Sequence, residues 1–551
     1  MPTHTHTHTH THTHTQHLRS RQTESTPLAM VELGLTLRIL PIPLLSVSLA
    51  ASVLYLLQRS HGRKNPKKSS GKASRPPLPP GPPPPLFLAK LLSLMRQPRF
   101  DIGPLLRELH ARHGSVISLR LLTTTVFVAD RRLAHRVLVR DGAAFAYRPP
   151  LVEPNPLFNA GNINSAPYGP YWRLVRRNLA AETLHRAHLG LFAPARRWAC
   201  DALVASLLRD TSECVVVTVR PFLRRAMSDL LAYMCFGERL PPDVLDEIDT
   251  LERHALRTAT SFPIFAIFPS ITKRIFRKRW AAHVAVRRRQ EEVYAQLIHA
   301  TSAAVADEDQ PPCYARSLLA LRVADDGDRP LTDAEMVSLC SEFLNAGTDT
   351  TVTLLEWIMA ELVNHPDVQA KVYEEVIRAK RELDDAVNNL QAIPYLKAVV
   401  LEGLRLHPPG HYLVPHAVRS DAEIIGGYTV PKGAEVNFMV AEIGRDESVW
   451  TAAREFRPER FLDGGEGSGV DITGSREIKM MPFGAGRRMC PGYALGMHHA
   501  EFFVGSLVRE LEWLPAAEGE TVNMEETVDF TTVMKYPLRA RIVPRNKSYL
   551  T

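Results

Sequence analysis

The feature that most constrains this chain is a loop rich in glycine and arginine that ends near a cysteine. The loop, Met481–Gly492, reads MPFGAGRRMCPG. Two glycines, four and six residues before Cys490, allow a tight turn and a close approach of the backbone to another group. Pro491 suits the first position of a helix, and apolar residues recur at helical spacing from Tyr493 to Leu514. We therefore expect Cys490 at a helix N-terminus, where a thiolate is favoured as nucleophile or metal ligand.

A long helical pattern with polar residues at its centre is the second feature. It runs from Thr332 to about Asn364, and such a helix reaches roughly 50 Å. Thr332 and Glu335 form the T-x-x-E pattern of a capping box. Four residues are expected to share one helix face and to open a groove there: Phe343, Ala346, Gly347 and Thr350.

A third pattern pairs opposite charges at helical spacing. Glu402 and Arg405 are three residues apart and share a helix face, and Arg460 follows in the segment Phe456–Phe461, which reads FRPERF. On a surface helix such a pair contributes little to stability.

Together these motifs resemble the cytochrome P450 family. Residues Phe483–Gly492 match its haem-thiolate pattern F-G-x-G-x-R-x-C-x-G at every fixed position, and the other motifs follow in the expected order. The resemblance covers roughly residues 76–545 and is closest to the plant A-type group, most like family 89, subfamily A, with family 77 next. It implies a mainly α fold with small β-sheets, as a single large haem domain behind an N-terminal transmembrane helix.

The resemblance also implies the cofactor and the roles of individual residues. The cofactor is haem b (iron protoporphyrin IX), with Cys490 as the axial ligand of its iron. Asp349 and Thr350 are the expected acid–alcohol pair that delivers protons to dioxygen. The other residues expected to hold the haem are Trp172, Arg176, His416, Phe483 and Arg488. A buried structural triad is expected from Glu402, Arg405 and Arg460. The substrate pocket is expected to include Phe158, Phe343, Ala346, Tyr412, Leu413 and Val533.

The implied activity is a haem-thiolate monooxygenase that inserts one oxygen atom from O2 into a lipophilic plant metabolite. Because the sequence contains no evident flavin or NADPH module, electrons are expected from NADPH through a separate NADPH–cytochrome P450 reductase. Candidate contacts for that protein are Arg173, Arg177 and Arg487.

Two alternatives use the same fold differently. One is a hydroperoxide isomerase or dehydratase, whose members typically lose the acid–alcohol pair or carry an insertion in the cysteine loop. The other is a membrane scaffold with a non-catalytic haem, which predicts a damaged cysteine loop. Both motifs are intact here, which favours the monooxygenase.

The N-terminal part predicts membrane attachment. Residues 1–38 are a low-complexity His/Thr tail with a short lead-in, and Met30 is an alternative start to Met1. Residues 39–57 are uncharged and long enough for a transmembrane anchor. A cleaved signal peptide is disfavoured, because no small-residue cleavage site precedes the basic run. Residues 58–85 are a basic and then Pro-rich linker, and 86–551 are the haem domain. The basic flank predicts that the domain after the anchor lies in the cytosol. The resemblance implies a single-pass protein of the endoplasmic reticulum.

The charge distribution argues against nucleic acid as a partner. Of 67 Lys and Arg residues and 59 Asp and Glu residues, residues 1–75 hold ten and two, which leaves 57 of each sign in the rest. A formally neutral domain offers no general attraction to a phosphate backbone.

Overall fold

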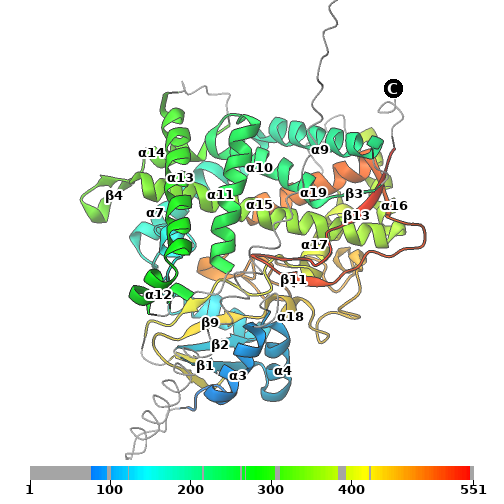
Figure 1. The fold of residues 1–551 in the computed structure, drawn as a ribbon. Helices are drawn as coiled ribbons and strands as arrows, with labels where there is room; N and C mark the ends of the chain where they lie inside the picture. Colours follow the sequence, from blue (N-terminus) through cyan, green and yellow to red (C-terminus); the bar gives the residue numbers. More distant parts are fainter. Residues whose placement is uncertain are drawn as a thin grey trace, which may run out of the picture. The chain divides into compact units, whose positions relative to one another are not determined.

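The longest helix of the fold, α15 (Asp333–Asn364), crosses the helical part of the molecule in the computed structural model (Figure 1). The structure describes residues 76–95, 101–121, 123–213, 216–260, 264–266, 268–303, 311–382, 393–420 and 423–545. The predicted capping box is confirmed, because the Thr332 hydroxyl accepts from the Glu335 N–H and the Glu335 carboxylate accepts from the Thr332 N–H. This arrangement satisfies two donors that a helix start leaves free.

A single large hydrophobic core surrounds α15. Helix α15 packs most extensively on α10 (Arg220–Phe236), and also on α13 (Arg277–Ala303) and α19 (Tyr493–Glu510). Residues in the middle and at the end of α15, including Trp357, are buried on nearly every side of the helix. A helix that is apolar nearly all round is stable only inside a protein. The packing around α15 therefore fixes the positions of its few polar residues.

The remaining helices complete this layer and the flanking loops. The α-helices are α3 (Pro84–Met95), α4 (Gly103–His113), α5 (Arg131–His135), α6 (Pro156–Asn159), α7 (Pro170–Asn178), α8 (Arg186–Leu191), α9 (Ala193–Glu213), α11 (Pro242–Thr260), α12 (Pro269–Ile275), α14 (Tyr314–Leu319), α16 (Pro366–Glu382), α17 (Pro394–Leu406) and α18 (Val440–Gly444). Short helical turns are η1 (Arg136–Arg140) and η2 (Leu179–Thr183), both π-helical, and the 3₁₀ turns η3 (Ile264–Ala266), η4 (Ala324–Asp326), η6 (Pro458–Phe461) and η7 (Gly486–Arg488).

The sheets are small. A four-stranded sheet has the order β1-β2-β9-β6, in which β1 (Val116–Arg120) and β2 (Thr124–Val128) pair antiparallel and β2 and β9 (Glu435–Phe438) pair parallel. Helices α3 and α4 lie against it (Figure 1). The other strands are β3 (Val217–Thr218), β4 (Arg322–Val323), β5 (Arg329–Pro330), β6 (His416–Ala417), β7 (Glu423–Ile425), β8 (Tyr428–Val430), β10 (Leu511–Pro515), β11 (Glu526–Val528), β12 (Thr532–Met534) and β13 (Arg539–Pro544). A mainly α fold with small sheets is therefore confirmed.

The described part of the predicted Pro-rich linker forms hydrogen bonds with the domain. The Ser118 hydroxyl on β1 donates to the Pro79 carbonyl at 2.7 Å, and Thr429 on β8 donates through its N–H to Pro77 and through its hydroxyl to Pro76. Proline lacks an N–H but keeps its carbonyl, so a polyproline chain can accept bonds from strands. Residues 76–83 are thus docked on the domain.

The predicted tail, transmembrane anchor and basic run lie outside the described residues. Within the part of the chain that is described, no helix combines the length and the apolar character needed to cross a bilayer.

Candidate active site

The cysteine loop is built as its glycines suggest. Gly484 and Gly486 have φ of 70° and 71°, a left-handed conformation that glycine adopts without strain. A Cβ on Gly486 would lie 1.9 Å from the Leu138 carbonyl oxygen of η1, so a side chain there is excluded. The loop closes on itself, because the Cys490 N–H donates to the Phe483 carbonyl at 2.8 Å.

The environment of the thiol differs from the expectation in one respect. Helix α19 begins at Tyr493 with Gly492 as its N-cap, so Pro491 precedes the helix and Cys490 lies three residues before it. Burial raises the pKa of the Cys490 thiol, although the Gly492 N–H and the charge of Arg176 act against the rise. Burial therefore opposes the thiolate form that the predicted helix position would favour. A metal that binds this sulfur must displace the thiol proton.

The end of the same helix also differs from the prediction. The apolar pattern to Leu514 predicted one helix, but α19 ends at Glu510 and the chain continues as β10. Trp513 is almost fully buried in that strand. A continuous apolar run fits a buried strand as well as a helix, so periodicity could not separate the two.

Of the four residues expected to line a groove on α15, Ala346 and Thr350 lie on its open side. Phe343 is buried against the ring of Tyr314 on α14, and a Cβ on Gly347 would lie 2.7 Å from Leu231 on α10. Ala346 is exposed in the middle of this otherwise buried helix. Residues 342, 346, 349 and 350 keep partial or full exposure and lie along the same side as Ala346. Phe343 is therefore a core residue that fixes the rotation of α15.

The acid and alcohol of α15 each have a partner. The Asp349 carboxylate accepts from Arg224 on α10 at 2.7 Å, and the same guanidinium binds Asp249 on α11 at 2.6 Å. The Thr350 hydroxyl donates to the Ala346 carbonyl at 2.6 Å. Burial raises the pKa of Asp349, while the charge of Arg224 lowers it. No sequence motif pointed to Arg224.

Two of the expected haem-holding cations stack on one tryptophan. The guanidinium of Arg488 lies 4.5 Å from the ring of Trp172, and that of Arg176 lies 5.4 Å from it. Arg488 donates to the carbonyls of Ala146, Ile163 and Ala166, and the Trp172 indole also donates to Ile163. Arg176 donates to the Met489 carbonyl beside Cys490. The structure brings these residues to the cysteine loop.

Three further side chains belong to this group. His416 is buried and its Nδ1 lies 2.6 Å from the Phe145 carbonyl oxygen, and burial lowers its pKa to about 3, with the nearby Arg148 acting in the same direction. Arg148 and Glu342 had no motif to mark them. Glu342 accepts from the N–H groups of Ile163 and Asn164, and burial raises its pKa to about 7.

The charged triad is assembled deep in the domain. Glu402 accepts from Arg405 at 2.6 Å and from Arg460 at 3.2 Å, and both Glu402 and Arg405 are 0% exposed. The remaining donors of Arg405 bind the carbonyls of Gly444, Ala453 and Glu455. The network therefore holds residues 444–455, which precede the cysteine loop, against α17.

The other expected pocket residues divide between two environments. Tyr412 packs edge-on against Phe127 of β2 at 6.2 Å, whereas Leu413 lies beside Gly484 of the cysteine loop. Successive residues of an extended chain point to opposite sides, so only one of the pair can face the loop. Phe158 on α6 is buried and packs against His254 of α11, and Val533 on β12 is partly exposed.

These residues fit the haem implied by the motifs. Cys490 would supply a sulfur ligand, and Arg148, Arg176 and Arg488 would supply positive charge for two propionates. The exposed methyl of Ala346 leaves open space beside α15. Phe483, whose ring lies against Gly496, would shield one side of the sulfur.

Comparison with known families and sequences agrees with these motifs. The family model described as cytochrome P450 matches residues 79–541. "Cytochrome P450 89A9" of Arabidopsis thaliana is 42% identical over 85% of this chain and 94% of its own length. Tryptamine 5-hydroxylase of Oryza sativa subsp. japonica is 31% identical over 89% of this chain and 93% of its own. Premnaspirodiene oxygenase of Hyoscyamus muticus is 31% identical over 92% and 99%.

Solved structures support the same fold. The retinoic acid-bound cyanobacterial CYP120A1 has a TM-score of 0.67 and 22% identity, covering 86% of this chain and all of that chain. A zebra fish cytochrome P450 with abiraterone has a TM-score of 0.66 and 22% identity, covering 81% of this chain.

Proposed function

The chain belongs to the cytochrome P450 family and is a haem-dependent monooxygenase, and from that premise we propose that it oxidises a lipophilic plant metabolite. The observation that carries the proposal is the intact cysteine loop, in which Cys490 lies three residues before α19 and the loop is contacted by Arg176. Bound haem supplies the activation of O2 and the transfer of one oxygen atom to the substrate. The other oxygen atom leaves as water, which needs two electrons and two protons.

Asp349 and Thr350 are the proposed source of those protons. Burial keeps the pKa of Asp349 above its ordinary value, so this carboxyl can gain and lose a proton near neutral pH more readily than a surface carboxyl. The Thr350 hydroxyl lies next along the helix and can exchange its bond to Ala346 for one to a water or to bound oxygen. The exposed Ala346 gives a substrate room on the same helix face.

The proposed electron donor is NADPH–cytochrome P450 reductase. Arg173, Arg177 and Arg487 are exposed near the cysteine loop, and Arg487 also donates to the Tyr168 hydroxyl at 2.8 Å. Exposed cations near the haem ligand suit an acidic partner and speed its association.

Attachment to the endoplasmic reticulum through residues 39–57 is also proposed. An independent feature supports contact with a lipid surface. The N-cap of α12, Phe268, is 65% exposed, and Ile271 and Ile275 within the helix are 56% and 66% exposed. Lys273 and Arg274 lie between these two isoleucines in the sequence. An exposed apolar helix face with basic neighbours suits a membrane interface.

Untargeted product analysis tests the activity. Membranes that contain this chain and the reductase are offered pooled plant metabolites, with and without NADPH, and products are compared by mass. We expect at least one lipophilic compound to gain one oxygen atom only with NADPH. If the only NADPH-dependent product were an isomer or a dehydrated hydroperoxide, the monooxygenase proposal would be lost.

The role of the thiol has its own test. Reduced, CO-bound protein is expected to show the long-wavelength Soret band of thiolate-ligated haem, and Cys490→Ala is expected to lose it. Cys200→Ala is the matched control, because Cys200 is buried in α9 away from the loop. Persistence of the band in Cys490→Ala would exclude Cys490 as the ligand.

A further inference from the structure

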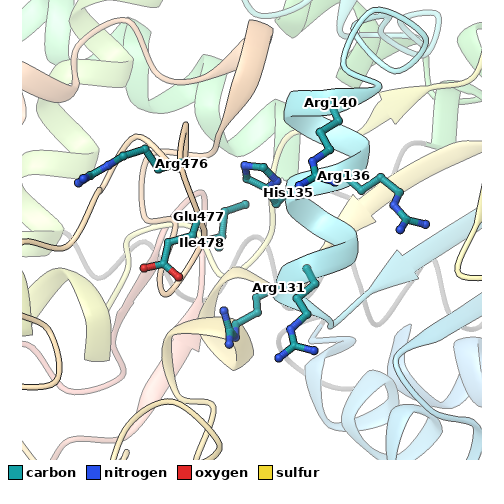
Figure 2. A pocket seen from close by; sticks show the side chains of 8 residues that line it. Arg131, His135, Arg136, Arg140, Arg476, Glu477 and Ile478 are labelled. Atoms are coloured by element: carbon teal, nitrogen blue, oxygen red, sulfur yellow. The ribbon is translucent and has the colours of Figure 1, made fainter.

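A basic pocket lies outside the proposed active site, between α5–η1 and the chain segment 476–478. Its volume is about 450 Å³. Figure 2 shows that one helical segment supplies one wall, and that residues Arg476, Glu477 and Ile478 face it from the other side. His135 lies between the walls, with its Nε2 3.2 Å from the Ser475 carbonyl oxygen. The helical wall contributes Arg131, Arg132, His135, Arg136 and Arg140.

The charge in this basic pocket is not balanced by the protein. Across the described ranges, the side chains of Arg131, Arg132, Arg136 and Arg140 have no hydrogen bond and no acidic partner within 4 Å. Arg476 lies 3.8 Å from Asp471, whose carboxylate is already bound by Thr473 and Ser475. Glu477 is the single acid of the lining, which also includes five arginines, although Figure 2 shows the Arg476 and Arg136 side chains pointing to opposite sides. Such an excess stands out in a chain that carries 57 charges of each sign over residues 76–551.

The helical wall is also joined to the cysteine loop. η1 is a single π-helical turn, a rare geometry that is common at functional sites. Its Leu138 carbonyl is the group that Gly486 approaches so closely that no side chain fits. On the opposite wall, Ile478 lies three residues before Met481, where the cysteine loop begins. A ligand that holds the two walls together would therefore stabilise the loop that carries Cys490.

The shape and chemistry of the pocket indicate the kind of ligand. A volume of this size matches small-molecule sites, whereas protein interfaces bury broad and flatter surfaces. Guanidinium groups bind phosphate oxygens in pairs and stay charged at all physiological pH values. The five arginines, set against Glu477 and the Asp471 beside Arg476, leave an excess of about three positive charges, which a diphosphate nearly matches.

We propose that the basic pocket binds a compact anion with at least two phosphate groups, either a free phosphate ester or the head group of an anionic lipid. The inference goes beyond the proposed monooxygenase function and does not depend on it. The bound anion is held by Arg132 and Arg140 and neighbouring guanidinium groups, and it stiffens the contact between η1 and the cysteine loop.

Calorimetric titration of the purified, haem-loaded full chain with inorganic pyrophosphate tests the proposal. We expect saturable binding that weakens as NaCl is raised. Arg132→Gln and Arg140→Gln are each expected to weaken it about tenfold, since each removes a charge-assisted contact. Arg322→Gln on β4 is the matched control, because Arg322 is also exposed and loses the same charge elsewhere. Pyrophosphate is also expected to raise the urea concentration at which the long-wavelength Soret band is lost.

Two further arms identify the source. ADP represents a free phosphate ester, and a water-soluble short-chain phosphatidylinositol bisphosphate represents a lipid head group. Preferential binding of either, lost in Arg132→Gln, supports the proposal and assigns the source. Binding that does not saturate, or that is equal in Arg132→Gln and Arg322→Gln, overturns it. If pyrophosphate does not bind but Arg132→Gln weakens reductase binding, the pocket is instead a contact for an acidic protein surface.

Discussion

Two groups of arginines lie inside the same domain, and they differ in what balances their charge. Arg405 and Arg460 share the Glu402 carboxylate, Arg460 also pairs with Glu466, and their remaining donors bind backbone carbonyls. Arg148, Arg176 and Arg488 also donate to carbonyls, but the one acid that acts on all three is Glu342. The first group is complete, whereas the second holds more positive than negative charge.

This difference appears in the titration of the second group. Burial, together with the repulsion from Arg488, lowers the pKa of Arg148 to about 9, and burial with repulsion from Arg176 lowers that of Arg488 to about 10. Buried cations that repel one another are costly unless an anion joins them. The first group therefore serves the fold, and we propose that the second binds the haem propionates. Four predictions test that distinction.

Breaking the complete group should have the largest effect. Arg405→Ala leaves Glu402 buried with one partner fewer, and we expect a loss of about 3–5 kcal/mol in the free energy of unfolding. Thermal unfolding measures it. Arg454→Ala, at an exposed arginine of the neighbouring segment, is the control. Equal unfolding temperatures for the two variants would contradict the structural role of Arg405.

The second prediction concerns pH and Glu342. Its pKa is raised from 4.5 to about 7 in the folded chain, so the folded state binds the proton more tightly than the unfolded state. This contribution is complete below about pH 4.5 and is lost as the pH rises through about 7.

Replacing this carboxyl should flatten the pH dependence. Urea unfolding of Glu342→Gln should lose less stability between these pH values than wild type, by at most about 3 kcal/mol. Glu518→Gln, at an exposed position, should leave the profile unchanged. A profile of Glu342→Gln that parallels wild type would show that this carboxyl is charged throughout.

The third prediction addresses the incomplete group directly. Arg488→Gln removes a cation that contacts Trp172, so haem transfer to an acceptor protein should become about tenfold faster while the chain stays folded. Arg488→Lys keeps the charge, so its rate of haem transfer should fall between those of wild type and Arg488→Gln. Arg487→Gln, one residue away and exposed, serves as control. If Arg488→Gln lost as much unfolding free energy as Arg405→Ala, the proposed difference between the two groups of arginines would be contradicted.

The smallest effect is expected at Arg224, which pairs with Asp349 outside both groups. Arg224→Gln removes the charge that lowers the pKa of Asp349, so that pKa should rise further above its ordinary value. The pH dependence of product formed per NADPH should then shift upward. Arg225→Gln alters an exposed pair and should not shift it. An unchanged profile in Arg224→Gln would remove Arg224 from the control of Asp349.

Local patterns predicted a large part of this molecule. The capping box of α15, the tight glycine turn before Cys490 and the pairing of Glu402 with Arg405 all depend on residues within a few positions of one another. Backbone propensity and short-range side-chain geometry decide such features, so they can be predicted without the rest of the fold.

Other features needed the tertiary structure. The rotation that buries Phe343 against Tyr314 and exposes Ala346 depends on which helices surround α15, and the opposite directions of Tyr412 and Leu413 depend on the sheet. The docking of the prolines, too, needed strands that lie far away in the chain.

By itself, the sequence determined the family and the mainly α fold, and it singled out Cys490 as the proposed haem ligand. Only the tertiary structure decided which distant charges meet: Arg148 and Glu342 beside the haem cations, Arg224 on Asp349, and the unpaired arginines of the basic pocket. The physical reason is that a motif records neighbours along the chain. The pKa of a buried group, by contrast, depends on neighbours in space, which packing brings together from separate elements.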